Sequence, residues 1–124
     1  MASEIMSEFS VVNRLMSFRH AGRGLVTTLK TQHNAWIHLA AAITVVVAGA
    51  AVGLRLEDWK WLALTIALVW FAETINTAFE YLCDVVSPNN NEAVKHAKDI
   101  AAGAVLICAI NAVLMGAMIF LPYL

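Results

Sequence analysis

The sequence predicts an all-α membrane protein, with an N-terminal amphipathic surface helix followed by three transmembrane helices. Of the 124 residues, 60% are hydrophobic and 14% are charged, and the mean hydropathy of +0.71 is far above that of an ordinary soluble domain. The apolar residues gather into three runs, each about the ~20 residues that cross a bilayer as a helix. A mixed basic and apolar segment precedes the first run. We expect a single domain over residues 1–124.

Composition also excludes some classes of function. The net charge is −1, and the eight lysines and arginines form no long basic run, so nucleic acid is not an expected partner. Cys83 and Cys108 lie in apolar segments without metal-binding spacing, which indicates small buried hydrophobic side chains. The first 30 residues hold four basic residues and no uninterrupted apolar core, so we expect no secretory signal and a first span that is retained.

The segment of about residues 8–33 is predicted to be the surface helix. Apolar side chains alternate at helical spacing with four basic residues, Arg14, Arg19, Arg23 and Lys30. This pattern is typical of a helix that lies in the membrane interface. A short helix packed on the cytoplasmic end of the protein itself is an equally good interpretation. Gly22 and Gly24 would permit a break near its middle.

The first span is predicted at about 35–54. It is interrupted only by His38 and Thr44, and we interpret His38 as a hydrogen-bond donor between helices in preference to a metal ligand. Trp36 lies where aromatic side chains anchor helices at the interface. Gly49 and Gly53 form a GxxxG pattern, which favours close helix pairing but also arises by chance in an alanine-rich span.

The second and third spans are predicted at about 61–83 and 96–121. A polar turn over residues 55–60 precedes the second span, and Pro88 with the three asparagines that follow it is the strongest turn signal in the chain. The third span is interrupted only by Asn111, which we interpret as a contact between helices, and Pro122 ends it.

Basic residues predict the orientation of this multi-pass chain. The N-terminal segment carries four, and the loop after the second span adds Lys95 and Lys98, whereas the opposite side has only Arg55 and Lys60. The more basic side faces the cytoplasm. The N-terminus is therefore expected in the cytoplasm and the C-terminus outside.

The second span carries a row of polar residues, which we call the polar face: Glu73, Asn76, Thr77, Glu80 and Asp84. Intervals of three and four place all five on one side of a helix. Ionisable groups inside a membrane are costly and mark functional sites, although protonated carboxyls that only bond helices together remain an alternative. Asn76 fits either interpretation. Because three spans barely enclose two carboxylates, we expect a small homo-oligomer.

The spacing of the carboxylates favours phosphoryl transfer. Glu80 lies near the wet interface, where a carboxylate binds a divalent cation, and Glu73 lies seven residues deeper, ~10 Å away, where a carboxylate takes up a proton. Lys98 and Asp99 begin the third span at the same level and offer contacts for a nucleotide, although such a pair also occurs at solvated helix ends. No phosphate-binding glycine loop of the G-x-x-x-x-G-K-[ST] type is present.

Two motifs carry a resemblance to a known family. The run Glu73-x-x-Asn76-Thr77-Ala78-x-Glu80-x-x-x-Asp84, followed by Ala97-Lys98-Asp99-x-Ala101-Ala102-Gly103, resembles the signature of the bacterial diacylglycerol kinase and undecaprenol kinase family of small membrane lipid kinases. The resemblance covers the chain from about Ser17. It implies a homotrimer in the bacterial cytoplasmic membrane, with active sites shared between subunits, that transfers the γ-phosphoryl group of Mg-ATP to a diacylglycerol or undecaprenol hydroxyl.

The resemblance also implies roles for individual residues. Glu73 would be the general base, with Asn76 as a polar positioning residue beside it. Magnesium would be held by Glu80, with Gln32 adjacent. The expected contacts to ATP are Lys98, Asp99, His20 and Asn91.

The chain departs from the family pattern at two places. Family members often have a glutamate where this chain has Gln32, and Pro-Glu-Tyr-His where it has Pro88 and residues 89–91. An amide still offers oxygen to Mg²⁺ but neutralises no charge. Two other functions stay open: an ion or proton conduit formed by the oligomer, and an impaired family member that acts as an assembly partner. The polar face stops midway along the second span, which counts against the conduit.

Overall fold

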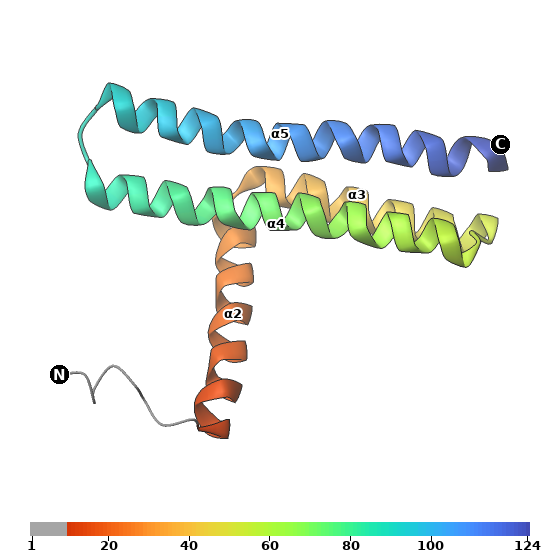
Figure 1. The fold of residues 1–124 in the computed structure, drawn as a ribbon, viewed down its shortest axis with the longest axis horizontal. Helices are drawn as coiled ribbons and strands as arrows, with labels where there is room; N and C mark the ends of the chain where they lie inside the picture. The colour runs from red at the N-terminus through yellow and green to blue at the C-terminus, as the bar shows by residue number, and fades with distance from the viewer. Residues whose placement is uncertain (1–9) are drawn as a thin grey trace.

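The computed structural model describes residues 10–124 and is all-helical over that range (Figure 1). Its elements, in chain order, are α2 (Val11–Thr31), α3 (His33–Val52), α4 (Leu56–Val86), α5 (Glu92–Phe120) and the 3₁₀ turn η1 (Leu121–Tyr123). The three helices α3, α4 and α5 are long and apolar enough to cross a membrane. The predicted helical class is thus confirmed over the described residues, and the number of helices able to span a membrane is the three that were predicted. Positions 8 and 9 of the predicted surface helix lie outside the described residues.

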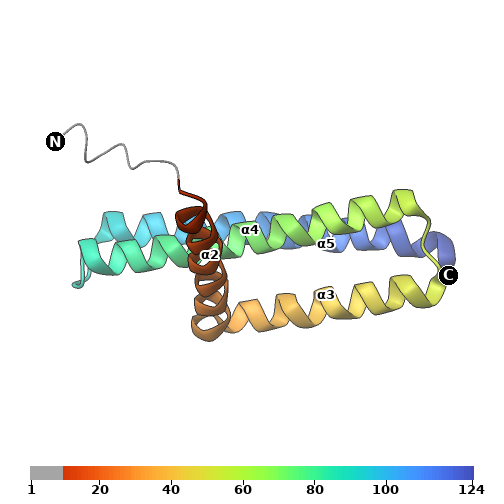
Figure 2. The same cartoon turned by 90° about the horizontal axis from the view of Figure 1, so that it is seen from below.

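The N-terminal helix is continuous where a break was permitted. Ser10 caps α2 by accepting a hydrogen bond from the backbone N–H of Asn13 at 3.3 Å, and the helix runs through Gly22 and Gly24 to Thr31. Only Gln32 separates α2 from α3, and its extended backbone, φ −114° and ψ 114°, redirects the chain there. Figure 2 shows α2 running across the direction of the other helices.

Both predicted loops are shorter than expected. The prediction of a polar turn over 55–60 was wrong, because α4 already begins at Leu56 with Glu57 and Asp58 in its first turn, where acidic side chains suit the helix dipole. Similarly, α5 begins at Glu92. There the Asn91 side chain accepts hydrogen bonds from the N–H groups of the second and third residues that follow it, at 2.9 and 3.2 Å, a standard N-terminal cap.

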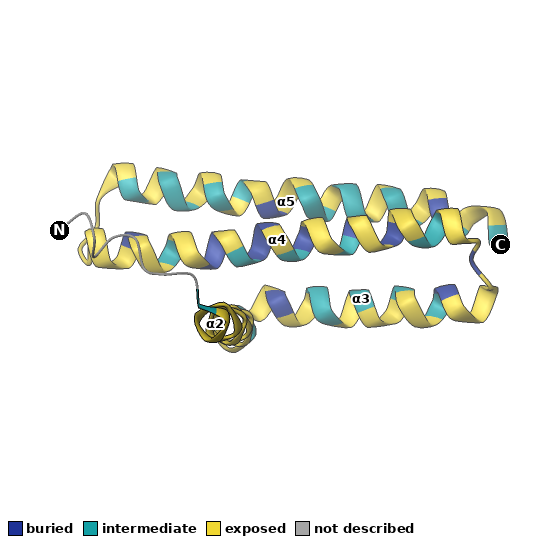
Figure 3. Cartoon of the chain, turned by 60° about the horizontal axis from the view of Figure 1, so that its bottom comes forward, coloured by how far each residue is buried: buried dark blue, intermediate teal, exposed yellow. Residues whose placement is uncertain are grey.

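Helix α4 is the centre of the chain. It runs antiparallel to α5 along most of its length, and both extend past the start of α3 (Figures 1 and 2). In its most apolar 18-residue segment, 33% of the residues are buried, against 11% in the corresponding segments of α3 and α5 (Figure 3). Large apolar side chains remain exposed on all three helices, as expected of surfaces that meet lipid or other subunits.

A small core closes the end of the bundle opposite the α4–α5 loop. Leu54, Leu62 and Ile119 form it. A Cβ atom on Gly49 would lie 2.8 Å from both Leu54 Cδ1 and Trp59 Cη2, so the missing side chain lets α3 and α4 approach closely. Gly53 ends α3 at φ +70°, which favours glycine. Both glycines of the GxxxG pattern therefore have a role within one chain.

Candidate active site

Burial along the polar face is graded. Asp84 is exposed and Glu80 is half-buried, whereas the side chains nearer the membrane centre are enclosed even in a single chain. Glu73 is 1% exposed and Asn76 is 6% exposed. The cytoplasmic end of α4 therefore presents a wet carboxylate, and the helix carries a second carboxylate about two turns deeper in dry surroundings.

Gln32 and Glu80 are brought into contact. The amide Nε2 of Gln32, at the junction of α2 and α3, donates a hydrogen bond to Glu80 Oε2 at 2.7 Å. Glu80 offers carboxylate oxygens, the hard ligands that Mg²⁺ prefers, and the Gln32 amide would offer its oxygen after a half-turn of its terminal torsion. Residues 10–124 contain no cluster of three or more acidic, histidine or cysteine side chains able to hold a metal by themselves. One carboxylate and one amide fit a magnesium ion that is held only partly by the protein and takes its remaining ligands from a substrate phosphate.

Deeper in the bundle, Glu73 faces His38 of α3. The distance from His38 Nε2 to Glu73 Oε2 is 3.4 Å, and the imidazole is 17% exposed. His38 thus lies between helices, as the sequence indicated. Glu73 Oε2 and Asn76 Oδ1 are buried without a hydrogen-bond partner among the described residues. Such acceptors cost free energy unless a ligand supplies a donor.

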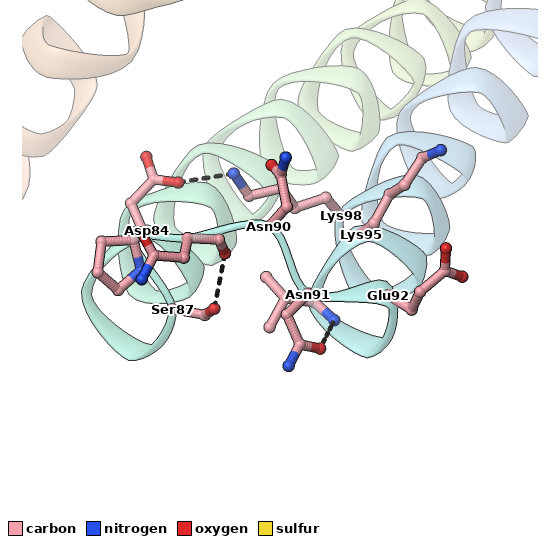
Figure 4. A pocket seen from close by; sticks show the side chains of 10 residues that line it. Asp84, Ser87, Asn90, Asn91, Glu92, Lys95 and Lys98 are labelled. Carbon is pink, nitrogen blue, oxygen red and sulfur yellow. Dashed lines mark hydrogen bonds and ion pairs between the residues drawn. The ribbon is translucent and has the colours of Figure 1, made fainter.

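A cavity of about 550 Å³ opens at the α4–α5 loop (Figure 4). Lys98 Nζ forms an ion pair with Asp84 Oδ1 at 2.6 Å across it, which joins the two helices. Asn91 and Lys95 also line the cavity. The cavity therefore combines two cationic side chains and amide groups, which can contact a phosphate-containing ligand, with the carboxylates of Asp84 and Glu92.

Two predicted nucleotide contacts lie elsewhere in a single chain. Asp99 is exposed on α5 and does not line the cavity. His20 is exposed on α2, twelve residues before Gln32, or about 18 Å along a helix. The sequence interpretation did not include Lys95 and Ser87, which do line the cavity. Lys95 precedes Lys98 by three residues, so the two share a helix face, and that spacing was the available signal.

The polar groups of this chain lie along the half of its central helix nearer the α4–α5 loop, from the exposed end to the buried middle. This arrangement is typical of a membrane enzyme that acts at the interface. Residues 19–120 match the sequence model of the family described as prokaryotic diacylglycerol kinase. The undecaprenol kinase of Bacillus subtilis is 40% identical over 108 residues, which cover 87% of this chain and 88% of that protein. A diacylglycerol kinase of Synechocystis sp. is 42% identical over 111 residues, which cover 89% of this chain and 63% of the relative.

The chain belongs to the prokaryotic diacylglycerol kinase family. It is a multi-pass membrane protein and a lipid kinase, for which ATP is the co-substrate. The resemblance noted in the sequence is thereby confirmed.

Proposed function

We propose that this chain transfers the γ-phosphoryl group of ATP to the hydroxyl of a membrane lipid alcohol, with Glu73 as general base. One observation carries the proposal: Glu73 Oε2 and Asn76 Oδ1 are buried acceptors without donors among residues 10–124, one helical turn apart on the same face. An alcohol hydroxyl has one proton to donate, and we assign that donor to the Glu73 carboxylate. A free carboxylate at that position then takes the hydroxyl proton.

In the proposed reaction the lipid binds at Glu73, the deeper end of the polar face, and the magnesium ion binds nearer its exposed end, at Glu80. Glu73 accepts the proton of the lipid hydroxyl, the lipid oxygen forms a bond to the γ-phosphorus, and the bond to the β-phosphate oxygen breaks, so that ADP leaves with the electron pair. Asn76 orients the hydroxyl. Glu80, with Gln32 beside it, would hold Mg²⁺, which neutralises charge on the β- and γ-phosphate oxygens when bound.

We assign nucleotide binding to Lys98 and Asn91 in the loop cavity, with Asp99 and His20 as further contacts. Lys98 and Asn91 line one cavity, which supports their pairing. Asp99 and His20 are exposed in a single chain and lie outside that cavity. Their participation therefore requires a site completed by a neighbouring subunit. A homotrimer with shared sites meets this requirement and covers the exposed apolar faces.

The proposed setting is the bacterial cytoplasmic membrane, with the N-terminus and the α4–α5 loop in the cytoplasm and the C-terminus outside. Helix α2 would lie in the interface. Its crossing of the bundle direction (Figure 1) supports this position, as do its exposed apolar and basic side chains. Residues 1–124 would form one lipid kinase domain.

A competition assay tests the function and the lipid together. Purified protein in mixed micelles receives Mg-ATP labelled in the γ-phosphate, with diacylglycerol and undecaprenol present in equal amounts. We expect label in one lipid, and we favour undecaprenol because the match to the undecaprenol kinase covers 88% of that protein, against 63% of the diacylglycerol kinase. Label in neither lipid, with folded protein that binds ATP, would contradict the proposal.

The two other functions make different predictions. An ion conduit should show flux in proteoliposomes without ATP, and an impaired assembly partner should fail to bind ATP. No observation in the described residues favours either. The polar face stops midway along α4 and does not cross the membrane, which counts against a conduit.

A further inference from the structure

Among residues 10–124, two polar side-chain contacts join the Gln32–α3 segment to α4, and the His38–Glu73 pair is the second. The first is the Gln32–Glu80 hydrogen bond at 2.7 Å. His38 follows Gln32 by six residues, and Glu73 precedes Glu80 by seven, which is about 9–10 Å along a helix in each case. The two contacts are therefore successive pairings between two antiparallel segments. The Gln32–Glu80 contact lies at the proposed metal position, and the His38–Glu73 contact lies deeper, where the proposed proton transfer takes place.

Glu73 depends on His38 for polar contact. The carboxylate is 1% exposed, and Glu73 Oε2 has no hydrogen-bond partner among residues 10–124. His38 Nε2 lies 3.4 Å away, slightly beyond the 2.7–2.9 Å usual for a charge-assisted hydrogen bond. A small side-chain adjustment would close the gap, and catalytic hydrogen bonds commonly tighten when substrate binds.

Among the described residues, the cavity beside His38 offers it no other ionisable partner. Its imidazole lines an apolar cavity of about 480 Å³ between α3, α4 and α5, and among the described residues lining that cavity it is the only ionisable one. Imidazole Nε2–H is a donor in the protonated ring and in one neutral tautomer. The geometry therefore leaves Glu73 as the acceptor for this donor.

We propose that His38 is a positioning residue for the reaction: it donates a hydrogen bond through Nε2 to Glu73 Oε2 and thereby aims the carboxylate at the lipid hydroxyl. The proposal rests on the proposed function of Glu73 as base. Without this contact the Glu73 side chain would be free to rotate inside an apolar site. A misplacement of about 1 Å at a reacting group can cost about 10²-fold in rate.

Steady-state kinetics of the full chain in mixed micelles test the proposal. His38→Ala should lower kcat about 10²-fold and leave KM for Mg-ATP within about twofold. His38→Gln should recover most of kcat, because its amide can still donate to the carboxylate. The matched control is His33→Ala, an exposed histidine on the same helix, which should behave as the wild type. Should His38→Ala fail to fold, His38→Asn, whose shorter amide falls short of Glu73, replaces it.

A double-mutant cycle separates positioning from packing. In a Glu73→Asp background the shorter carboxylate no longer reaches the imidazole, so His38→Ala should cost less than about fivefold. An unchanged kcat for His38→Ala would overturn the proposal, as would equal losses for His38→Ala and His38→Gln. A full loss in the Glu73→Asp background would do the same. Glu73→Gln identifies which idea fails: if it is inactive while His38→Ala is normal, only the role of His38 falls, and if it is active, the proposed base falls too.

Discussion

Gln32 Nε2 donates a hydrogen bond to Glu80 Oε2 at 2.7 Å, and this contact ties the junction of α2 and α3 to the central helix. The junction is a single extended residue, so the side chain that redirects the chain also reaches the carboxylate. For the amide to bind a metal, its oxygen must face Glu80 in place of its nitrogen, which a half-turn of the terminal torsion achieves. The contact therefore keeps Gln32 beside the proposed metal position.

The first prediction concerns magnesium. Gln32→Glu should lower the Mg²⁺ concentration for half-maximal activity by about tenfold, because a second carboxylate adds charge attraction for the cation. Gln32→Ala should raise it severalfold. A magnesium titration at saturating ATP measures both, with Asn34→Ala, an exposed neighbour on α3, as control. If neither substitution changes the magnesium requirement or the rate, Gln32 does not belong to the site.

A second prediction concerns Asn76, whose Oδ1 is buried and unpartnered in the described chain. Asn76→Ala should reduce kcat by about 10- to 100-fold, since the lipid hydroxyl loses the amide that orients it. It should not lower the unfolding temperature, because the substitution breaks no existing hydrogen bond at that oxygen. Thr65→Val is the matched control, a buried threonine about three turns before Asn76 on the same side of α4. Normal activity with reduced stability would instead identify Asn76 as a contact between helices.

A third prediction concerns the Lys98–Asp84 pair at 2.6 Å. Lys98→Met should raise KM for ATP at least tenfold, because the cavity loses a cation facing the phosphates. The unfolding temperature should hardly change, since exposed ion pairs contribute little. Lys60→Met, at the opposite end of α4, is the control. A KM unchanged from wild type would remove Lys98 from the nucleotide site.

A fourth prediction separates fold from catalysis. Gly49→Ala places a Cβ atom 2.8 Å from Leu54 Cδ1 and Trp59 Cη2, so it should destabilise the protein by about 1–3 kcal/mol through overpacking. Gly103→Ala, where nothing lies within 4 Å, should have no such cost. Thermal unfolding in micelles compares the two. Equal stability of both variants would mean that α3 and α4 do not approach closely at Gly49.

Sequence periodicity predicted the helices and the polar face because both depend on local rules, namely apolar run length and a repeat of three to four residues. It could not predict that Gln32 reaches Glu80 or that His38 reaches Glu73, because those contacts depend on the register between two helices. Residues 55–60 were misassigned because polar composition alone does not separate a loop from an amphipathic first turn.

Only two of the four proposed nucleotide contacts lie together within a single chain. Lys98 and Asn91 share a cavity because a short loop brings the ends of α4 and α5 together. Asp99 and His20 have no such connection within the chain, and their proposed role depends on how subunits assemble. Contacts of that kind are absent from local sequence patterns.

Glu73→Gln tests the central claim most directly. The substitution preserves the size of the buried side chain and removes its ability to accept the hydroxyl proton, so transfer of the γ-phosphoryl group from ATP to lipid should fall by about 10²- to 10⁴-fold. Radiolabel transfer in mixed micelles measures this rate, and ATP binding together with thermal unfolding shows that the variant is folded. We expect a folded, ATP-binding protein whose lipid labelling is reduced by that factor, whereas full labelling by Glu73→Gln would contradict the account.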